Sequence, residues 1–114
     1  MSGPGPRLMS ADTLEDNKVY NNQNESLGEV EEIMINVNDG KVEYAVVEFG
    51  GFLGMGTKYF AVPWEAMQLD TKEECFRLNV TKEALENADG FDKDNWPDMA
   101  DPAFAARTRS VYGL

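Results

Sequence analysis

The sequence predicts an all-β fold of five or six short strands, and two observations carry this prediction. Short runs of alternating apolar and polar residues recur between residues 18 and 80, with the period of a half-buried strand. Turn-forming residues separate the runs, most clearly at Asn38-Asp39-Gly40, where Asp-Gly is typical of a hairpin turn. Strands of this length and spacing occur in small barrels and in sandwiches, and the pattern alone leaves both open.

The second strand, expected over residues 28–37, shows the alternation with one interruption. Its apolar residues recur at every second position, at Ile33, Ile35 and Val37, which predicts one buried face. Val30 is out of phase with that face. We therefore expect a β-bulge near Glu31-Glu32, because a bulge restores the phase and bends the strand as a barrel requires.

The third strand is apolar on both faces over residues 44–47. It should therefore lie at the centre of the sheet, with one face in the core and the other covered. Pro63 ends the fourth strand, because proline cannot donate a hydrogen bond to a β-ladder. The expected strands are residues 18–20, 28–37, 42–49, 58–62, 67–69 and 76–80.

Capping residues predict helices at both ends of this β-rich region. Ser10 is expected to cap a single helical turn, and Thr81 to cap a short helix over residues 82–88. Asp101-Pro102 is typical of the start of another helix. The apolar side of that helix is formed at helical spacing by Phe104, Thr108, Val111 and Tyr112.

The link between the third and fourth strands has an unusual composition, because solvated loops are normally polar. Gly51-x-x-x-x-Gly56-Thr57-Lys58 is close to a phosphate-binding loop, but Lys and Thr stand in the wrong order and a strand-like run follows instead of a helix. A structural hairpin with an apolar tip is therefore favoured over a phosphate site. The tip places Phe52, Leu53 and Met55 among Gly50, Gly51, Gly54 and Gly56.

The same stretch resembles the PRC-barrel family, and its small bacterial stress-associated members in particular. The resemblance rests on Phe49-Gly50-Gly51-Phe52-Leu53-Gly54-Met55-Gly56, followed by Phe60-Ala61-Val62-Pro63-Trp64. It extends to residues 27–33 upstream, and to residues 78–85 and 90–97 downstream. It implies a small β-barrel, similar to the cytoplasmic domain of the photosynthetic reaction-centre H subunit and to a domain of a ribosomal RNA maturation factor. No shared catalytic residue or cofactor comes with it.

The resemblance decides for a small PRC-type barrel with two peripheral helices. We expect a disordered tail at residues 1–8, the barrel at 9–80, and a helical extension at 81–114 that packs on the barrel. We expect Trp64 to anchor the core beneath the Pro63 turn and Trp96 to pack on the barrel, with its indole N–H bonded to a carbonyl. Structural roles are expected for Gly50, Gly51, Gly54, Gly56, Pro63, Trp64 and Trp96.

Composition argues against several classes of function. The chain of 114 residues fits one domain, and its net charge of −11 repels nucleic acids and anionic membranes. It has no histidine, which removes the commonest general base and metal ligand. No apolar run is long enough for membrane insertion. The single Cys75 cannot form an internal disulfide, so we expect a cytoplasmic protein. Glu73 and Glu74 should raise the pKa of this thiol by like-charge repulsion.

Asp92-x-Asp94-Asn95-x-x-Asp98 has some of the spacing of a calcium-binding loop. Trp96 stands where a third oxygen ligand belongs, Pro97 replaces the glycine, and no glutamate closes the loop. A capped, solvated turn is therefore favoured, and we predict neither a metal site nor a cofactor site.

The favoured function is a non-enzymatic protein-interaction or assembly module, with a stress link suggested by the resemblance. The alternative is a small-ligand or metal-ion-binding protein. The protein partner is unknown, and a weak homodimer and a monomer that covers its own loop remain open. The residues expected at the interface are Phe52, Leu53, Met55, Phe104, Val111 and Tyr112.

Overall fold

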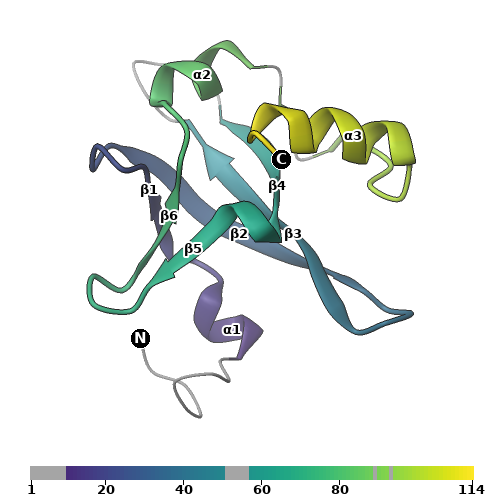
Figure 1. Cartoon of the computed structure of the whole chain (residues 1–114), viewed down its shortest axis with the longest axis horizontal. Coiled ribbons are helices and arrows are strands. Elements are labelled where there is room, and N and C mark those ends of the chain that lie inside the picture. Colours follow the sequence, from purple (N-terminus) through teal and green to yellow (C-terminus); the bar gives the residue numbers. More distant parts are fainter. Residues whose placement is uncertain (1–9, 51–56, 89, 93) are drawn as a thin grey trace.

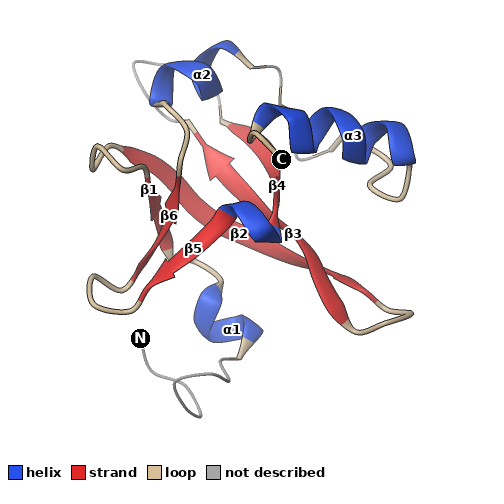
Figure 2. Cartoon of the chain, viewed as in Figure 1, coloured by secondary structure: helices blue, strands red, loops and turns tan. Residues whose placement is uncertain are grey.

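The computed structural model describes residues 10–50, 57–88, 90–92 and 94–114. Within these ranges, six strands form one sheet in the order β4-β3-β2-β1-β6-β5, which confirms the predicted all-β class and strand number. The sheet curls into a half-barrel whose edge strands are β4 and β5 (Figures 1 and 2). Neighbouring strands are antiparallel except β1 and β6. The strands are β1 (Lys18–Tyr20), β2 (Ser26–Asn36), β3 (Lys41–Phe49), β4 (Lys58–Pro63), β5 (Met67–Asp70) and β6 (Cys75–Leu78).

The curl depends on β2, which pairs with β1 on one side and β3 on the other. Gly28 has a φ of +143°, and a Cβ atom at this position would lie 1.9 Å from the Glu48 carbonyl oxygen. Only glycine fits there, both for its backbone angle and for the close approach of β3. The register of β2 against β3 also shifts between Val30 and Glu32, so the bulge predicted at this point is confirmed.

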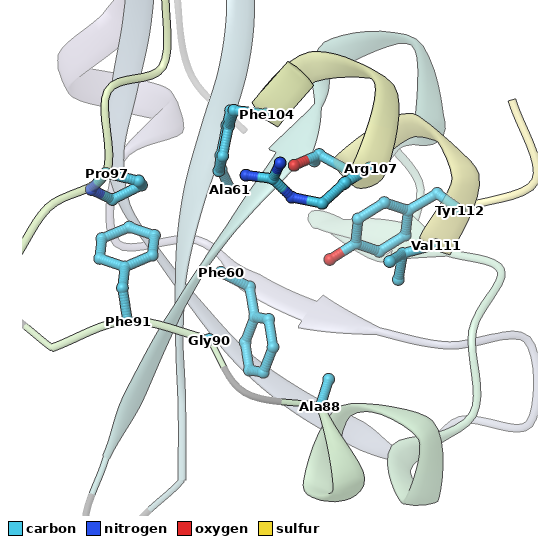
Figure 3. A pocket seen from close by; sticks show the side chains of 11 residues that line it. Phe60, Ala61, Ala88, Gly90, Phe91, Pro97, Phe104, Arg107, Val111 and Tyr112 are labelled. Atoms are coloured by element: carbon cyan, nitrogen blue, oxygen red, sulfur yellow. The ribbon is translucent and has the colours of Figure 1, made fainter. Parts of the chain in front are cut away.

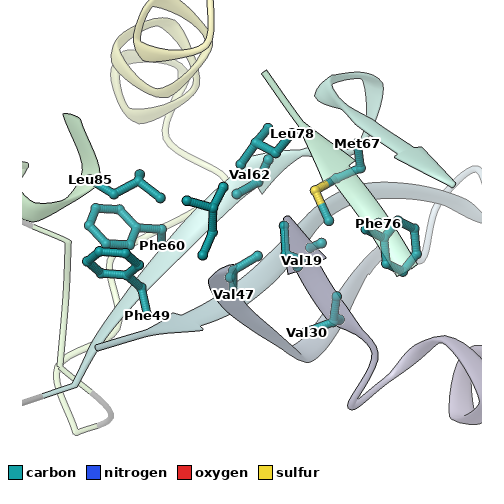
Figure 4. Close-up of a cluster of buried hydrophobic side chains, with 12 residues drawn as sticks. Val19, Val30, Val47, Phe49, Phe60, Val62, Met67, Phe76, Leu78 and Leu85 are labelled. Atoms are coloured by element: carbon teal, nitrogen blue, oxygen red, sulfur yellow. The ribbon is translucent and has the colours of Figure 1, made fainter. Parts of the chain in front are cut away.

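The hydrophobic core lies inside the curl (Figure 4). Every strand contributes to it, and Leu85 of helix α2 (Lys82–Asn87) closes one end beside Phe49 and Phe60. Val30, out of phase in the sequence, is fully buried because the bulge turns it inward. The labelled core residues are Val19, Val30, Val47, Phe49, Phe60, Val62, Met67, Phe76, Leu78 and Leu85.

The central position predicted for the third strand is confirmed, since β3 lies between β2 and β4. Ala45 and Val47 belong to the core, while Tyr44 and Val46 of the opposite face are also buried. Helix α3 (Pro102–Val111) packs on β4, and its Phe104 meets Tyr44 edge to face, with ring centroids 5.8 Å apart. This helix therefore covers part of the outer face of the sheet.

The outer half of the β2–β3 hairpin departs from the sequence prediction. Ile35 is 50% exposed and Val37 is 91% exposed, although the alternation predicts that both lie on a buried face. The reason is the length of the two strands. β1 pairs with β2 only at residues 26–29, so the far end of the hairpin projects beyond the rest of the sheet (Figure 1).

The predicted helix caps are confirmed. The side chains of Ser10, Thr81 and Asp101 accept backbone hydrogen bonds at the starts of α1 (Ala11–Leu14), α2 (Lys82–Asn87) and α3. Pro102 occupies the first turn of α3. A short 3-10 helix, η1 (Trp64–Ala66), joins the two edge strands β4 and β5.

The loop over residues 21–25 is polar, but it is organised by a buried side chain. Asn21 is fully buried, and its Oδ1 accepts hydrogen bonds from the backbone N–H groups of Gln23 and Glu25 at 3.0 and 2.9 Å. Arg77 of β6 donates to the Asn21 carbonyl at 3.1 Å and to Asn24 Oδ1 at 2.6 Å. These contacts join the β1–β2 loop to β6.

Replacing Gly28 by alanine tests the close approach of β2 and β3. Gly28→Ala should destabilise the fold by more than about 4 kcal/mol, because the new Cβ atom meets backbone and not a movable side chain. Gly40→Ala is the matched control, since Gly40 also has a positive φ but no atom within 4 Å of the added Cβ. It should cost about 1 kcal/mol. Urea unfolding measures both values, and equal losses would contradict this account of the bend.

Candidate functional site

A hollow of about 320 Å³ lies between β4, α3 and the segment that follows α2 (Figure 3). Its walls are mostly apolar and come from elements far apart in the sequence. Phe60 and Ala61 belong to β4, Phe91 and Pro97 to the segment after α2, and Phe104 and Val111 to α3. An apolar hollow of this size with few polar groups is the usual form of a small-molecule site.

Three polar side chains of the C-terminal region line the same hollow: Arg107, Thr108 and Tyr112. In Figure 3 the Arg107 guanidinium group points toward Phe104 and Ala61, and the Tyr112 hydroxyl group points toward Phe60. Burial raises the pKa of Tyr112, so this phenol is neutral at physiological pH and able to donate a hydrogen bond. Apolar walls and polar donors thus meet in one place.

Gly90 and Phe91 form part of the outer wall, where the chain attaches to the edge of β4. Phe91 and Tyr59 exchange two backbone hydrogen bonds of 2.9 Å. Gly90, with a φ of +62°, makes this approach feasible, since a Cβ atom there would lie 2.9 Å from the Tyr59 carbonyl oxygen. The Lys58 ammonium group donates to the carbonyl groups of Glu86 and Ala88, at 2.9 and 2.8 Å, and so holds the end of α2 against β4.

A second groove, of about 460 Å³, lies on the hairpin side of α3. Met34, Ile35 and Tyr44 of the hairpin form one wall, and Met99 and Ala105 contribute to the other. The exposed end of the hairpin is continuous with this groove through Ile35, which lines it. The groove adds apolar surface beside a part of the molecule that already projects into solvent.

The structure brings three of the predicted interaction residues together. Phe104, Val111 and Tyr112 all line the first hollow. Phe104 and Tyr112 are half-buried, whereas Val111 is 56% exposed. The remaining predicted interaction residues, Phe52, Leu53 and Met55, lie outside the described residues, as do Gly51, Gly54 and Gly56 of the predicted structural set.

The other residues predicted to be structural lie at the edges of the core. Gly50 has a φ of +134°, and Pro63 is almost completely buried at the end of β4. Trp64, half-buried in η1, packs on the core with its ring 5.8 Å from that of Phe76. Trp96 is 39% exposed and packs against Phe91 and Tyr59, with ring centroids 5.2 and 6.3 Å away.

The aspartate segment after α2 forms hydrogen bonds with its own backbone N–H groups. The Asp98 carboxylate accepts a hydrogen bond from the Ala100 N–H at 3.0 Å, and the Asp92 carbonyl accepts one from Asn95 at 3.1 Å. Across the described part of the chain, no three acidic or cysteine side chains are arranged to hold a metal ion.

Cys75 is buried, and burial is the main cause that raises the pKa of its thiol. Arg77 opposes the rise, while Asp70 and Glu73 add to it. The direction predicted from sequence is therefore confirmed, but the largest cause is loss of solvent and not repulsion between neighbouring charges. Sequence reasoning missed this because the burial of residue 75 depends on how β5 and β6 close the sheet.

Arg107 was also missed by sequence reasoning. Its position on α3 places it beside the apolar stripe, but nothing in the sequence shows which charged side chain faces a hollow. A weak indication was present, since the residues three and four positions away on either side are Ala103, Phe104, Ser110 and Val111. None of these can form an ion pair with arginine along the helix.

A family model for the PRC-barrel domain matches residues 6–85 of this chain. The match covers all six strands and ends within α2. Together with the curled six-stranded sheet, it shows that the chain belongs to the PRC-barrel family, as the sequence resemblance implied. A comparison with curated proteins gives no match. Within the described ranges, no helix combines the length and the apolarity that crossing a lipid bilayer requires.

Truncating Trp64 tests its predicted role as an anchor of the core. Trp64→Ala should lower the free energy of unfolding by about 3 kcal/mol, as truncation of a large packed aromatic side chain does. Trp96→Ala serves as the control and should cost clearly less, because Trp96 packs outside the core cluster. Urea melts of both variants decide the question. A loss below about 1 kcal/mol for Trp64→Ala would show that this ring does not anchor the core.

The raised pKa of Cys75 predicts a loss of stability at alkaline pH. The folded state holds the thiol proton more tightly than the unfolded state does. This contribution to stability is therefore complete below the unfolded pKa of about 8.5, and it is lost as pH rises through the folded value. Urea unfolding at a series of pH values from neutral to alkaline should show a steeper decline for the wild type than for Cys75→Ala. Equal slopes would refute the prediction.

Proposed function

We propose that this PRC-barrel domain is a non-enzymatic protein-interaction or assembly module, and that the projecting end of the β2–β3 hairpin is its main contact surface. The observation that carries the proposal is the exposure of Val37 and Ile35, at 91% and 50%. Isolated exposed apolar residues are common on soluble proteins. Here, however, they adjoin an apolar groove against α3, which makes a continuous surface of the kind that marks interaction sites.

The hairpin that carries this surface is held in place by neighbouring strands and by α3. Its inner half is held between β1 and β4 in the sheet, and Tyr44 at the groove packs against Phe104 of α3. Asn36 donates a hydrogen bond to Glu43 across the outer half at 3.3 Å. A surface held in place before binding loses less conformational entropy on association, which favours affinity.

Charge favours a partner with a basic rim around an apolar centre. The chain carries a net charge of −11, and Asp39 and Glu43 are exposed near the hairpin end. A basic partner is drawn to such a surface, while a second acidic copy is repelled except where salt screens the charges. The weak homodimer therefore remains a second candidate, supported by the exposed Val111 on α3.

The absence of enzymatic activity is part of the proposal. It is supported by the lack of histidine and by the burial of the only thiol, Cys75. We also propose a cytoplasmic location, which the single cysteine supports. A role under stress is supported only by the sequence resemblance to stress-associated family members.

Replacing the two exposed hairpin residues tests the contact surface. A partner is first purified on the full chain from native lysate at moderate salt and identified, and its affinity is then measured by calorimetry with purified components. Ile35→Ser/Val37→Ser should weaken binding at least tenfold, since each lost apolar contact is worth about 1.5–3 kcal/mol. Val111→Ser is the control on the other side of α3, and it should leave the affinity within a factor of three.

Two outcomes would contradict the proposal. If the double variant binds the partner as tightly as the wild type, the hairpin is not the contact surface. If light scattering shows wild-type dimers at micromolar concentration that Val111→Ser abolishes, the α3 side is the interface and the partner is a second copy.

A further inference from the structure

Among the arginines that the structure describes, Arg107 differs from Arg77 and Arg109 because its side chain has neither a hydrogen bond nor an ion pair with a described residue. The chain contains 21 acidic and 10 basic residues, so carboxylates are abundant. Two other arginines form ion pairs with carboxylates: Arg77 pairs with Asp70, and Arg109 pairs with Glu65. The neighbours of Arg107 on its own helix offer no acidic side chain, as noted above.

Arg107 lines the apolar hollow against β4 together with two hydroxyl groups, those of Thr108 and Tyr112. Neither hydroxyl group has a side-chain hydrogen bond to another described residue. Figure 3 shows the guanidinium group on the side of Phe104 and the phenol on the side of Phe60, with the apolar walls below and between them. The hollow therefore combines one fixed positive charge, two hydrogen-bond donors and an apolar floor.

We propose that this hollow binds a small organic carboxylate with an apolar body, such as a medium-chain or aryl-substituted acid. The carboxylate accepts hydrogen bonds from Arg107, whose planar guanidinium group matches a carboxylate with two parallel N–H donors. Thr108 and Tyr112 supply further donors. The apolar body lies against Phe60, Phe91 and Phe104.

The size of the hollow and the charge of the chain narrow the class of ligand. A volume of about 320 Å³ corresponds to about ten water molecules, and so to a ligand of about ten non-hydrogen atoms. A single arginine in a chain of net charge −11 favours a monoanion, because the negative charge of the whole chain repels a multiply charged anion such as a phosphate ester more strongly. The apolar walls disfavour acetate and other small hydrophilic anions, which gain nothing from them.

The test uses octanoate as the probe and the full chain, with binding followed by NMR amide shifts and by calorimetry. Octanoate should bind in the micromolar to millimolar range and shift amides of α3, β4 and residues 90–97. Octanamide, which lacks the charge, should bind at least tenfold more weakly, because a hydrogen-bonded ion pair is worth about tenfold or more in affinity. Acetate should produce no comparable shifts.

Arg107→Gln should lower the affinity for octanoate at least tenfold without changing the melting temperature, since this side chain is exposed and makes no bond with the described residues. Lys72→Gln is the matched control: it also removes one positive charge, lies on an exposed loop outside the lining of the hollow, and should change the affinity less than threefold. Val111→Trp should block binding by filling the hollow.

Three results would overturn the proposal: octanoate producing no shifts at millimolar concentration, octanamide binding as tightly as octanoate, or Lys72→Gln reducing affinity as much as Arg107→Gln. A short peptide ending in leucine provides a fourth arm. If it binds more tightly than octanoate through the same residues, the site captures a protein C-terminus and not a small acid. None of these results bears on the hairpin surface, which is tested separately.

Discussion

The close approach of Gly28 to the Glu48 carbonyl oxygen is the constraint on which the rest of this domain depends. At this point β2 leaves the direction of its outer half and carries β1, β6 and β5 over the core. A side chain at residue 28 would force β2 and β3 apart at this point, because its Cβ atom would collide with the Glu48 backbone. The bulge after Val30 adds to the bend and turns that valine inward. The curl is thus produced by two local departures from regular β-structure, as is common where a sheet closes toward a barrel.

This way of closing the sheet explains where the exposed apolar surface lies. The inner half of β2 pairs with both β1 and β3, whereas its outer half pairs with β3 alone. Ile35 and Val37 therefore project into solvent. Helix α3 lies on β4 and not over the hairpin end. The outer face of the sheet is therefore covered only in part, with a groove on one side of Phe104 and a hollow on the other. The proposed contact surface and the proposed carboxylate site both lie mainly outside the hydrophobic core cluster.

The arginines that the structure describes differ in their partners. Arg77 joins β6 to the β1–β2 loop through Asn21 and Asn24, and it pairs with Asp70. Arg109 pairs with Glu65 of η1, lowers the pKa of that carboxyl group, and ties α3 to the connection between β4 and β5. Arg107, which lies between them in the chain, forms no hydrogen bond or ion pair with a described residue. Its exposed guanidinium group is the positive charge that our proposal assigns to an anion with an apolar body.

By itself, the sequence determined the fold class, the six strands, the bulge near Glu31 and the helix caps, because each depends on short-range chemistry: alternation, phase, turn residues and side-chain acceptors near a helix start. The sequence also indicated the PRC-barrel family, through the motifs at residues 49–56 and 60–64. Only the tertiary structure decided that Ile35 and Val37 are exposed, that Asn21 is buried, that burial dominates the Cys75 pKa, and that Arg107 and Tyr112 line one hollow. Each of these depends on which distant segments cover a residue, and periodicity states only which residues share a face.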